Sequence, residues 1–424
     1  MKHIVIIGNG ISGITAARHI RKRSDHRITV ISSETEHFFS RTALMYIYMG
    51  HMQYAHTKPY EDFFWDKNRI VLKKARVSSV DFGASELHFE DGEKMVYDDL
   101  ILATGSQPNK FGWPGQDLKG VQGLYSFQDL ETMERDTKGI SNAVIVGGGL
   151  IGIEMAEMLA SRKIHVTFLV REAGFWDNVL PKEESDMVTR HIREHHIDLK
   201  LGSELKEICS DEDGRVRGVT TSNGEEISCQ FVGLTVGVSP NIGFLKNTDL
   251  ETDRGILVDR YLRTNIPNVY ALGDCAQQRE ALPNRAAIEQ VWYTGKMMGE
   301  TVAATICGLA TEYRPGVWFN SAKFFDIEYQ TYGRVPSKLH DDEESLWWQH
   351  ANGKQGLRIV FHKETKAILG FNAMGIRLRH MVCDSWIRES AQLDVVLRDL
   401  HKADFNPEFS ANFAKEVRAS FQLP

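Results

Sequence analysis

HIVIIGNGISG, at residues 3–13, decides the fold together with a second copy of its pattern, NAVIVGGGLIG, at residues 142–152. Each stretch begins with an apolar run, as expected of a parallel β-strand that is buried on both faces. Each then reads Gly-x-Gly-x-x-Gly and leads into an amphipathic segment with helical periodicity. Strand, tight turn and helix, found twice in this order, predict an α/β protein built on parallel sheets. The six glycines are Gly8, Gly10, Gly13, Gly147, Gly149 and Gly152.

The first glycine turn has the features of a dinucleotide-binding site. Gly8 permits the tight turn, Gly10 lets the backbone approach a pyrophosphate, and Gly13 lets the following helix pack closely on the strand. The pyrophosphate would then lie at the positive end of that helix. The next strand, RITVISSE, ends at Glu34, where a carboxylate can accept hydrogen bonds from a ribose diol.

Two dinucleotide sites in one chain suggest that one cofactor passes electrons to another. The chain has 424 residues, enough for two or three domains. Its formal net charge of −7 argues against bulk nucleic-acid binding. Its apolar runs are too short to span a bilayer, and the N-terminus leads directly into a strand with no room for a signal peptide. We therefore expect a cytoplasmic protein that does not insert into membranes.

The cysteines argue against two other classes of protein. None of the five lies in the first 208 residues, and no pair has Cys-x-x-Cys spacing. This pattern favours neither a secreted disulfide framework nor a zinc site, and we expect no metal centre. The five are Cys209, Cys229, Cys275, Cys307 and Cys383.

Two further motifs complete a specific pattern. YDDLILATGSQPN, at residues 97–109, predicts a strand that ends in Ala103, Thr104 and Gly105, and NVYALGDCA, at residues 268–276, contains Asp274. With the two glycine turns, these motifs resemble in kind and order the FAD-dependent pyridine nucleotide reductases with two dinucleotide-binding domains.

The resemblance implies where the cofactors bind. The first glycine turn would hold FAD, the second would hold NADH or NADPH, and the Ala-Thr-Gly segment would link the two domains. Asp274 would bond the ribityl chain of the flavin, in keeping with a carboxylate at the end of a strand. Val77 falls where the family's adenine-contacting backbone lies, and Gly237 matches the close approach to the nicotinamide.

The resemblance also implies an interrupted domain order. An FAD-binding domain would comprise residues 1–108 and 236–315, with an NAD(P)-binding domain inserted at 109–235. Residues 316–424 would form a small α+β domain, because segments such as LRIVFHKE predict antiparallel strands and helical stretches follow. The expected fold class is thus α/β, with two Rossmann-like domains and a small C-terminal α+β domain.

The branch of the family follows from a missing cysteine. Disulfide reductases and several oxidases place a reactive cysteine after the second strand, but FFSRTALMYIYMG at residues 38–50 contains none. The chain therefore resembles the NAD(P)H:ferredoxin and rubredoxin reductases, with the apoptosis-inducing-factor type as cousins. Their Arg-Pro-x-Leu-x-Lys pattern over the flavin is matched here at Arg41 and Leu44 and departed from at Thr42 and Tyr46.

The departure at Tyr46 affects a second expected flavin-site residue. The lysine that Tyr46 replaces commonly pairs with a glutamate, which is matched here by Glu154. Glu154 could be held by a hydrogen bond from Tyr46, or could simply be an acid favoured by the helix dipole. Trp318 matches an aromatic position near the flavin, where it could shield the ring or lie on the electron route. The candidate catalytic residues are Arg41, Tyr46, Glu154 and Trp318.

The preferred nicotinamide cofactor depends on the end of the strand HVTFLVRE. Glu172 occupies the place of Glu34, but NADH-specific relatives usually hold the ribose with an acid two positions earlier, where this chain has Val170. Arg171 could clamp a 2′-phosphate by charge-assisted hydrogen bonds. On balance we favour NADPH.

Three hypotheses remain open for what the reduced flavoprotein does next. The first is a small iron–sulfur protein such as ferredoxin or rubredoxin. The second is a quinone at a membrane surface, because four apolar residues near the C-terminus recur every four positions and form one helical stripe. The third is a redox-sensing flavoprotein that acts by binding a partner. Under any of the three hypotheses the protein could be a monomer or a homodimer. The stripe consists of Phe409, Phe413, Val417 and Phe421.

Overall fold

The computed structural model describes residues 1–408 and 413–421, and these divide into two compact units. Unit 1 comprises Met1–Phe111, Gln122–Lys138 and Gly237–Pro315. Unit 2 comprises Gly112–Val121, Gly139–Val236 and Gly316–Pro424. The three-domain division expected from the sequence stays a prediction, and each unit is described by itself.

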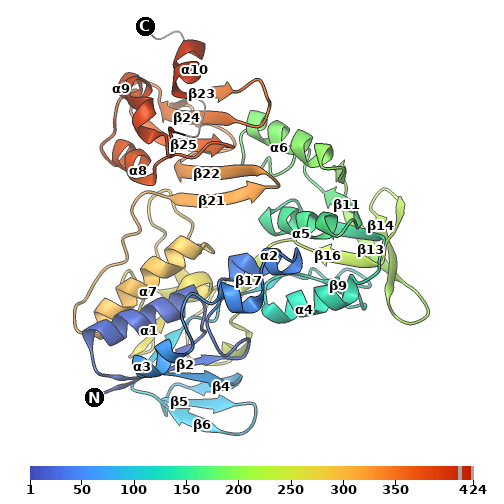
Figure 1. The fold of residues 1–424 in the computed structure, drawn as a ribbon. Helices are drawn as coiled ribbons and strands as arrows, with labels where there is room; N and C mark the ends of the chain where they lie inside the picture. The colour runs from blue at the N-terminus through green and yellow to red at the C-terminus, as the bar shows by residue number, and fades with distance from the viewer. Residues whose placement is uncertain (409–412, 422–424) are drawn as a thin grey trace. The chain divides into compact units, whose positions relative to one another are not determined.

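Unit 1 is built on a parallel sheet of five strands in the order β19-β7-β1-β2-β3. The sheet is covered on one face by α1 (Ile11–Arg23) and α7 (Trp292–Ile306), which lie side by side in Figure 1. The close approach of the two helices needs a glycine at position 299, because a Cβ there would lie only 2.6 Å from the carbonyl oxygen of Ser12. The strands are β1 (His3–Ile7), β2 (Arg27–Ser32), β3 (Ile70–Lys74), β7 (Asp99–Leu102) and β19 (Val269–Ala271).

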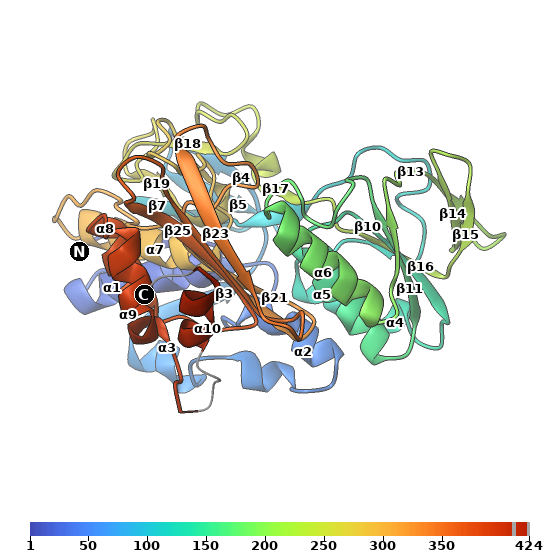
Figure 2. The ribbon, with the colours of Figure 1, turned by 90° about the horizontal axis from the view of Figure 1, so that it is seen from above.

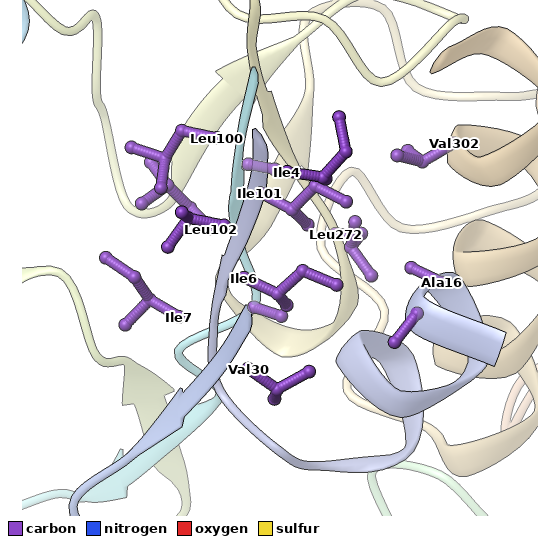
Figure 3. Close-up of a cluster of buried hydrophobic side chains, with 14 of the residues drawn as sticks. Ile4, Ile6, Ile7, Ala16, Val30, Leu100, Ile101, Leu102, Leu272 and Val302 are labelled. Atoms are coloured by element: carbon purple, nitrogen blue, oxygen red, sulfur yellow. The ribbon is translucent and has the colours of Figure 1, made fainter. Parts of the chain in front are cut away.

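The core of unit 1 fills both faces of this sheet. Figure 3 shows Ile4 and Ile6 of β1 pointing towards Ala16 of α1 and Val302 of α7, while Ile7 points to the other side. All five side chains are buried. Burial on both faces explains why these strands read as continuous apolar runs rather than as alternating ones.

Shorter elements surround the central sheet of unit 1. They include a three-stranded antiparallel sheet, two two-stranded pairs and three short helices. The strands are β4 (Val77–Asp81), β5 (Glu86–Phe89), β6 (Lys94–Val96), β8 (Ser106–Pro108) with β17 (Val238–Pro240), and β18 (Ile256–Val258) with β20 (Ala276–Gln278). The helices are α2 (Leu44–Tyr48), α3 (Phe63–Lys67) and α4 (Phe127–Asp136).

Unit 2 contains a second sheet, in the order β12-β11-β10-β16-β9, whose first four strands are parallel. Helices α5 (Leu150–Ser161) and α6 (Lys182–Glu194) follow two of its strands, and a small antiparallel sheet of three strands accompanies it. The strands are β9 (Val121–Gln122), β10 (Asn142–Val146), β11 (His165–Val170), β12 (Asp198–Leu201) and β16 (Phe231–Leu234), and then β13 (Leu205–Ser210), β14 (Val216–Thr221) and β15 (Glu226–Ser228).

The duplication read from the sequence extends to individual hydrogen bonds. Gly8 donates its N–H to the carbonyl of Ile31 on the neighbouring strand, at 2.8 Å. Gly147, at the same point of the second sheet, donates to the carbonyl of Leu169 at 3.0 Å. The two halves therefore share a turn geometry as well as a sequence pattern.

The C-terminal part of unit 2 is an antiparallel sheet of five strands in the order β21-β22-β25-β24-β23. Three helices lie together beside it in Figure 2: α8 (His380–Arg388), α9 (Leu393–Asp399) and α10 (Phe413–Ser420). The expected fold class is confirmed. The strands are β21 (Phe319–Phe324), β22 (Ile327–Gly333), β23 (Glu343–Gln349), β24 (Gly356–His362) and β25 (Ile368–Met374).

The C-terminal apolar stripe packs within unit 2. Phe413 and Val417 of α10 are buried in a cluster with side chains of the antiparallel sheet, and the partly buried Phe421 packs against it. Phe409 lies outside the described residues. The part of the stripe that the structure describes is therefore occupied by the protein's own core. Among the described residues, every helix is too short or too polar to cross a bilayer.

Candidate functional site

The first glycine turn contains two glycines that the chain itself requires. Gly8 has a φ of 119°, and a side chain there would overlap the carbonyl oxygen of Ala103. A side chain at Gly13 would overlap the carbonyl oxygen of Gly8 and press on Ile6. These two positions allow the tight turn and the close approach of α1 that the sequence predicts.

Gly10 differs, because no described part of the chain needs a glycine there. Its φ is −69°, which any residue can adopt, and a Cβ would meet no described heavy atom within 4 Å. Gly10 is also the N-cap of α1, whose first turn, Ile11-Ser12-Gly13, is uncharged. Free N–H groups at a helix N-terminus attract anions. The open space and these donors together fit a pyrophosphate, which would explain the glycine.

The second glycine turn repeats this division of roles. A Cβ at Gly147, whose φ is 106°, would lie 2.6 Å from the carbonyl oxygen of Thr235, and one at Gly152 would lie 2.8 Å from the ring of Phe168. At Gly149, the N-cap of α5, the nearest described heavy atom to a Cβ is 4.0 Å away. We call each of these sites a cradle: the open space over a glycine N-cap together with the N–H groups that begin the helix. The first cradle is at Gly10 of unit 1, and the second is at Gly149 of unit 2.

Asp274 lies three residues beyond the end of β19, within the 3-10 turn Gly273–Cys275. Its carboxylate accepts hydrogen bonds from the hydroxyls of Ser106, at 3.2 Å, and Tyr125, at 3.3 Å. Burial raises the pKa of Asp274 in spite of these bonds. A buried carboxylate with two long hydrogen bonds has room for further donors, and a polyol such as the ribityl chain would supply them.

Glu34 and Arg41, two expected cofactor-binding residues, bind each other. The Arg41 guanidinium donates to Glu34 Oε1 at 2.8 Å and to Oε2 at 2.6 Å. The N–H of Phe127, the first residue of α4, donates to Oε1 at 2.8 Å. A carboxylate offers about four acceptor positions, so three of them are taken here and little capacity remains for a ribose diol.

Tyr125 connects several of these groups, although no sequence motif marks it. Its hydroxyl accepts a hydrogen bond from the N–H of Ser106 at 2.9 Å, and its ring lies 4.4 Å from the guanidinium of Arg41. A side chain at Gly105 would come within 2.6 Å of the Tyr125 hydroxyl. The spacing of Ser126 and Asp129 marks the start of α4 as a capping box, but it carries no signal for Tyr125.

The Ala-Thr-Gly segment bonds to two parts of unit 1. The N–H of Ala103 donates to the carbonyl of Ile7 at 2.8 Å, and the hydroxyl of Thr104 donates to the carbonyl of Asn241, also at 2.8 Å. The next residues form β8, which pairs with β17.

Gly237 and Val77, two other expected cofactor contacts, also lie in unit 1. Gly237 has a φ of 87°, and its carbonyl accepts a hydrogen bond from the N–H of Asn109 at 3.1 Å. Val77 is buried at the start of β4.

Glu154 lies in α5, in the turn of helix that follows the second cradle. Burial raises the pKa of Glu154 to about 7, and the charge of Glu157 adds to this effect. Lys323 of β21 opposes it, and its ammonium group binds Glu157 Oε1 at 2.7 Å. A cation of unit 2 thus acts on Glu154, which the sequence did not lead us to expect.

The other candidate catalytic residues are divided between the units. Trp318 lies in unit 2, just before β21, and its carbonyl accepts a hydrogen bond from the N–H of Gly333 at 2.8 Å. Tyr46, in α2 of unit 1, stacks on His51 with ring centres 6.1 Å apart.

At the strand end that is expected to select the nicotinamide cofactor, Val170 is buried and Arg171 already binds Glu172. Val170 is fully buried, and a side chain at Gly148 would come within 2.8 Å of it. Arg171 is largely exposed, and its Nε donates to Glu172 Oε1 at 2.8 Å. Nε is the only Arg171 atom used in this bond, so the terminal nitrogens of the guanidinium remain available to a phosphate.

Three of the five cysteines are buried in the structure and two are partly exposed. The Cys275 thiol lies 3.4 Å from the carbonyl oxygens of Leu102 and Leu272, and burial raises its pKa. Burial also raises the pKa of Cys229, to about 12, and that of Cys383. Cys209 and Cys307 are partly exposed thiols. A thiolate nucleophile is disfavoured at the buried positions.

Comparison with known proteins gives a consistent result. Residues 2–295 match the family described as pyridine nucleotide-disulphide oxidoreductase. Rhodocoxin reductase of Rhodococcus erythropolis is 31% identical over 332 residues, which cover 76% of each chain. The ferredoxin–NAD(P)+ reductase of a Sphingomonas species is 30% identical over 344 residues, which cover 78% of this chain and 80% of the relative.

Solved structures share the fold over most of the chain. The ferredoxin reductase from Rhodopseudomonas palustris superposes with a TM-score of 0.80, with 23% identity, over 88% of this chain and 91% of its own. Putidaredoxin reductase in its covalent complex with putidaredoxin superposes with a TM-score of 0.81 and 19% identity, over 99% of this chain and 98% of its own.

Proposed function

The chain belongs to the pyridine nucleotide-disulphide oxidoreductase family, and we propose that it carries electrons from NADPH to a small iron–sulfur protein. It is an oxidoreductase that uses FAD and a pyridine nucleotide and passes electrons to an external acceptor. The choice of NADPH, the iron–sulfur partner and the roles of single residues are the proposal.

The observation that carries the proposal is the pair of open cradles at Gly10 and Gly149. Each is a helix N-cap where the described chain leaves space for a side chain but the sequence has glycine. A dinucleotide pyrophosphate over each helix N-terminus would account for both glycines. Two such sites match the need for two cofactors.

In this proposal the residues of unit 1 hold FAD. Gly10 and the N-terminus of α1 bind the pyrophosphate, and Asp274 accepts hydrogen bonds from the ribityl hydroxyls. Tyr125 positions Asp274 and Ser106. FAD held by these residues would supply the chemistry that links two-electron hydride transfer to one-electron transfer.

The residues of unit 2 hold the nicotinamide cofactor. Gly149 and the N-terminus of α5 bind its pyrophosphate, and Arg171 binds the 2′-phosphate of NADPH with its terminal nitrogens. Val170 supports this preference, because a buried valine offers no acceptor to the ribose of NADH. Glu154, whose pKa burial raises to about 7, can hold or release a proton near neutral pH.

The proposed acceptor rests on relatives and on the placement of the cysteines. The two relatives named above act on small electron-transfer proteins by their names. The buried cysteines of this chain are unsuited to thiol–disulfide transfer. A one-electron carrier is an acceptor that needs no thiol on the reductase.

The acceptor can be tested directly with the FAD-loaded protein and NADPH under anaerobic conditions. A ferredoxin, a rubredoxin and a water-soluble quinone would each be supplied at matched concentrations. We expect saturable reduction of one of the iron–sulfur proteins, with the Gly149→Ala variant as the control whose nucleotide binding is weakened. Saturable reduction of the quinone alone would contradict the proposal.

A further inference from the structure

A group of metal-ligand side chains lies in unit 2, separate from both cradles. His191 and His195 are four residues apart and lie at the C-terminal end of α6, on one face. Asp326 lies in the turn between β21 and β22, which follow one another in Figure 1. Asp326 Oδ1 is 2.5 Å from His191 Nε2 and 2.9 Å from His195 Nε2, and the two Nε2 atoms are 3.2 Å apart.

Glu194 lies beside the other nitrogen of the buried His191 ring. Its Oε2 is 3.4 Å from His191 Nδ1, while Nε2 faces Asp326 Oδ1. A carboxylate on the far nitrogen is the usual support of a metal-bound histidine.

The other two side chains are held in place by their surroundings. The ring of His195 stacks on Phe325 with a centroid distance of 4.2 Å and an interplanar angle of 8°. Phe325 has a φ of 55°, which is unusual for a bulky residue and is maintained only where contacts enforce it. Lys354 Nζ binds Asp326 Oδ2 at 3.0 Å, which leaves Oδ1 facing the histidines.

We propose that His191 Nε2, His195 Nε2 and Asp326 Oδ1 bind a divalent transition-metal ion, for which zinc is the best fit. Two imidazoles and a carboxylate suit zinc with water as the fourth ligand. Tetrahedral zinc with bonds of about 2.0–2.1 Å needs ligand atoms about 3.3 Å apart. The histidine nitrogens already have this spacing, and Asp326, which is half exposed, has room to move outwards.

The charges around the group allow a divalent ion. Asp326 and Glu194 are acidic, while Lys354 and Arg190, which lies 3.8 Å from Glu194, are basic. Both basic side chains are about half exposed and face water as well as their acids. The cysteine spacing predicted no metal centre, and this site uses none of the cysteines. Metal here would fasten the end of α6 to the β21–β22 turn.

The test uses the full-length FAD-loaded protein, treated with a chelator and then dialysed. Zinc binding would be followed by calorimetry, and Co²⁺ binding by absorption on the red side of the flavin bands. The variants are His195→Gln and Asp326→Asn, which spare the buried His191. His165→Gln, an exposed histidine of β11 in the same unit, is the matched control. An unchanged far-UV circular dichroism spectrum and an unchanged urea unfolding midpoint in the absence of metal show that each variant is folded, because all three positions lie in unit 2.

We expect one zinc ion per chain for the wild-type protein and for His165→Gln. Each ligand variant should lose affinity at least about tenfold, and the tetrahedral Co²⁺ bands should disappear. Equal zinc binding by the wild-type protein and the ligand variants would overturn the proposal. So would a wild-type protein that binds no zinc. Neither readout depends on the redox reaction.

Discussion

Glu34 and Arg41 form a two-point ion pair, with N–O distances of 2.8 and 2.6 Å, at the end of β2. The sequence predicts a cofactor contact for each residue separately, and in the structure the two bind each other. Glu34 also accepts a hydrogen bond from the N–H of Phe127, the first residue of α4. The first role of the pair is therefore to fasten the segment after β2 to the start of α4 beside the cofactor cradle.

A double-mutant cycle with Glu34→Gln and Arg41→Gln tests this role. The side chains are 16% and 31% exposed, so solvent weakens the pair only in part. We expect a coupling free energy of about 1–3 kcal/mol in urea unfolding. The exposed pair Arg69–Asp25 is the matched control and should give a clearly smaller coupling, because solvent screens exposed charges. Equal coupling in both pairs would show that Glu34 and Arg41 do not fasten this region.

The two cradles make opposite predictions for neighbouring glycines. Gly10→Ala should fold normally and bind FAD roughly tenfold more weakly, because the new methyl group displaces the pyrophosphate and not the protein. Gly149→Ala should keep FAD and weaken nucleotide binding by a similar factor. Gly8→Ala should instead destabilise unit 1, where the side chain overlaps Ala103.

Gly243→Ala is the control for these variants, because a Cβ there also meets no described atom within 4 Å. Flavin fluorescence titration and urea unfolding separate binding from stability. Unchanged FAD affinity in Gly10→Ala would remove the argument for this cradle.

Glu154 makes the stability of the protein depend on pH. Burial raises the pKa of Glu154 in the folded state to about 7, well above its unfolded value. The contribution of Glu154 to the free energy of unfolding is therefore fully present at acidic pH, below the unfolded pKa, and is lost as the pH rises through about 7. Relative to the wild-type protein, Glu154→Gln should gain about 1–3 kcal/mol between about pH 5 and pH 8.5.

Urea unfolding at several pH values measures this difference. Glu131→Gln, an exposed position of α4, is the control and should leave the pH dependence unchanged. If the Glu154→Gln profile runs parallel to that of the wild-type protein, Glu154 is ionised throughout and Lys323 stabilises it more than burial destabilises it.

Arg171 predicts the choice of nicotinamide cofactor. Arg171→Gln should lower kcat/KM with NADPH by about tenfold, the value of one charge-assisted contact, and leave NADH nearly unaffected. Glu172→Gln should favour NADPH further, because it removes the carboxylate that binds Arg171 Nε. Steady-state rates with both cofactors check this. A larger loss with NADH would reverse the assignment.

The fold was largely predictable because its signals are local in sequence. Residues 3–13 and 142–152 each contain a whole strand, turn and helix start, and the glycine spacing determines the turn. The family and its oxidoreductase class followed from the order of four such motifs and are confirmed. The C-terminal stripe was ambiguous in sequence, since Phe413 and Val417 could face a membrane or a core with the same spacing.

The candidate site was less predictable because its contacts join distant parts of the chain. Tyr125 reaches Asp274, which is 149 positions away, through a hydroxyl whose role no motif marks. Lys323 acts on Glu154 from another sheet of unit 2. Glu34 and Arg41 were each predicted to contact the cofactor, and only side-chain geometry shows that they pair.

The most direct test of the central claim is anaerobic stopped-flow reduction of the FAD-loaded protein by NADH and by NADPH, followed at the visible flavin band. We expect rapid bleaching that saturates with nucleotide concentration and is faster with NADPH, and in Gly149→Ala we expect half-saturation at a roughly tenfold higher nucleotide concentration. Slow bleaching by both nucleotides, or equal half-saturation concentrations in the wild-type protein and Gly149→Ala, would contradict this claim.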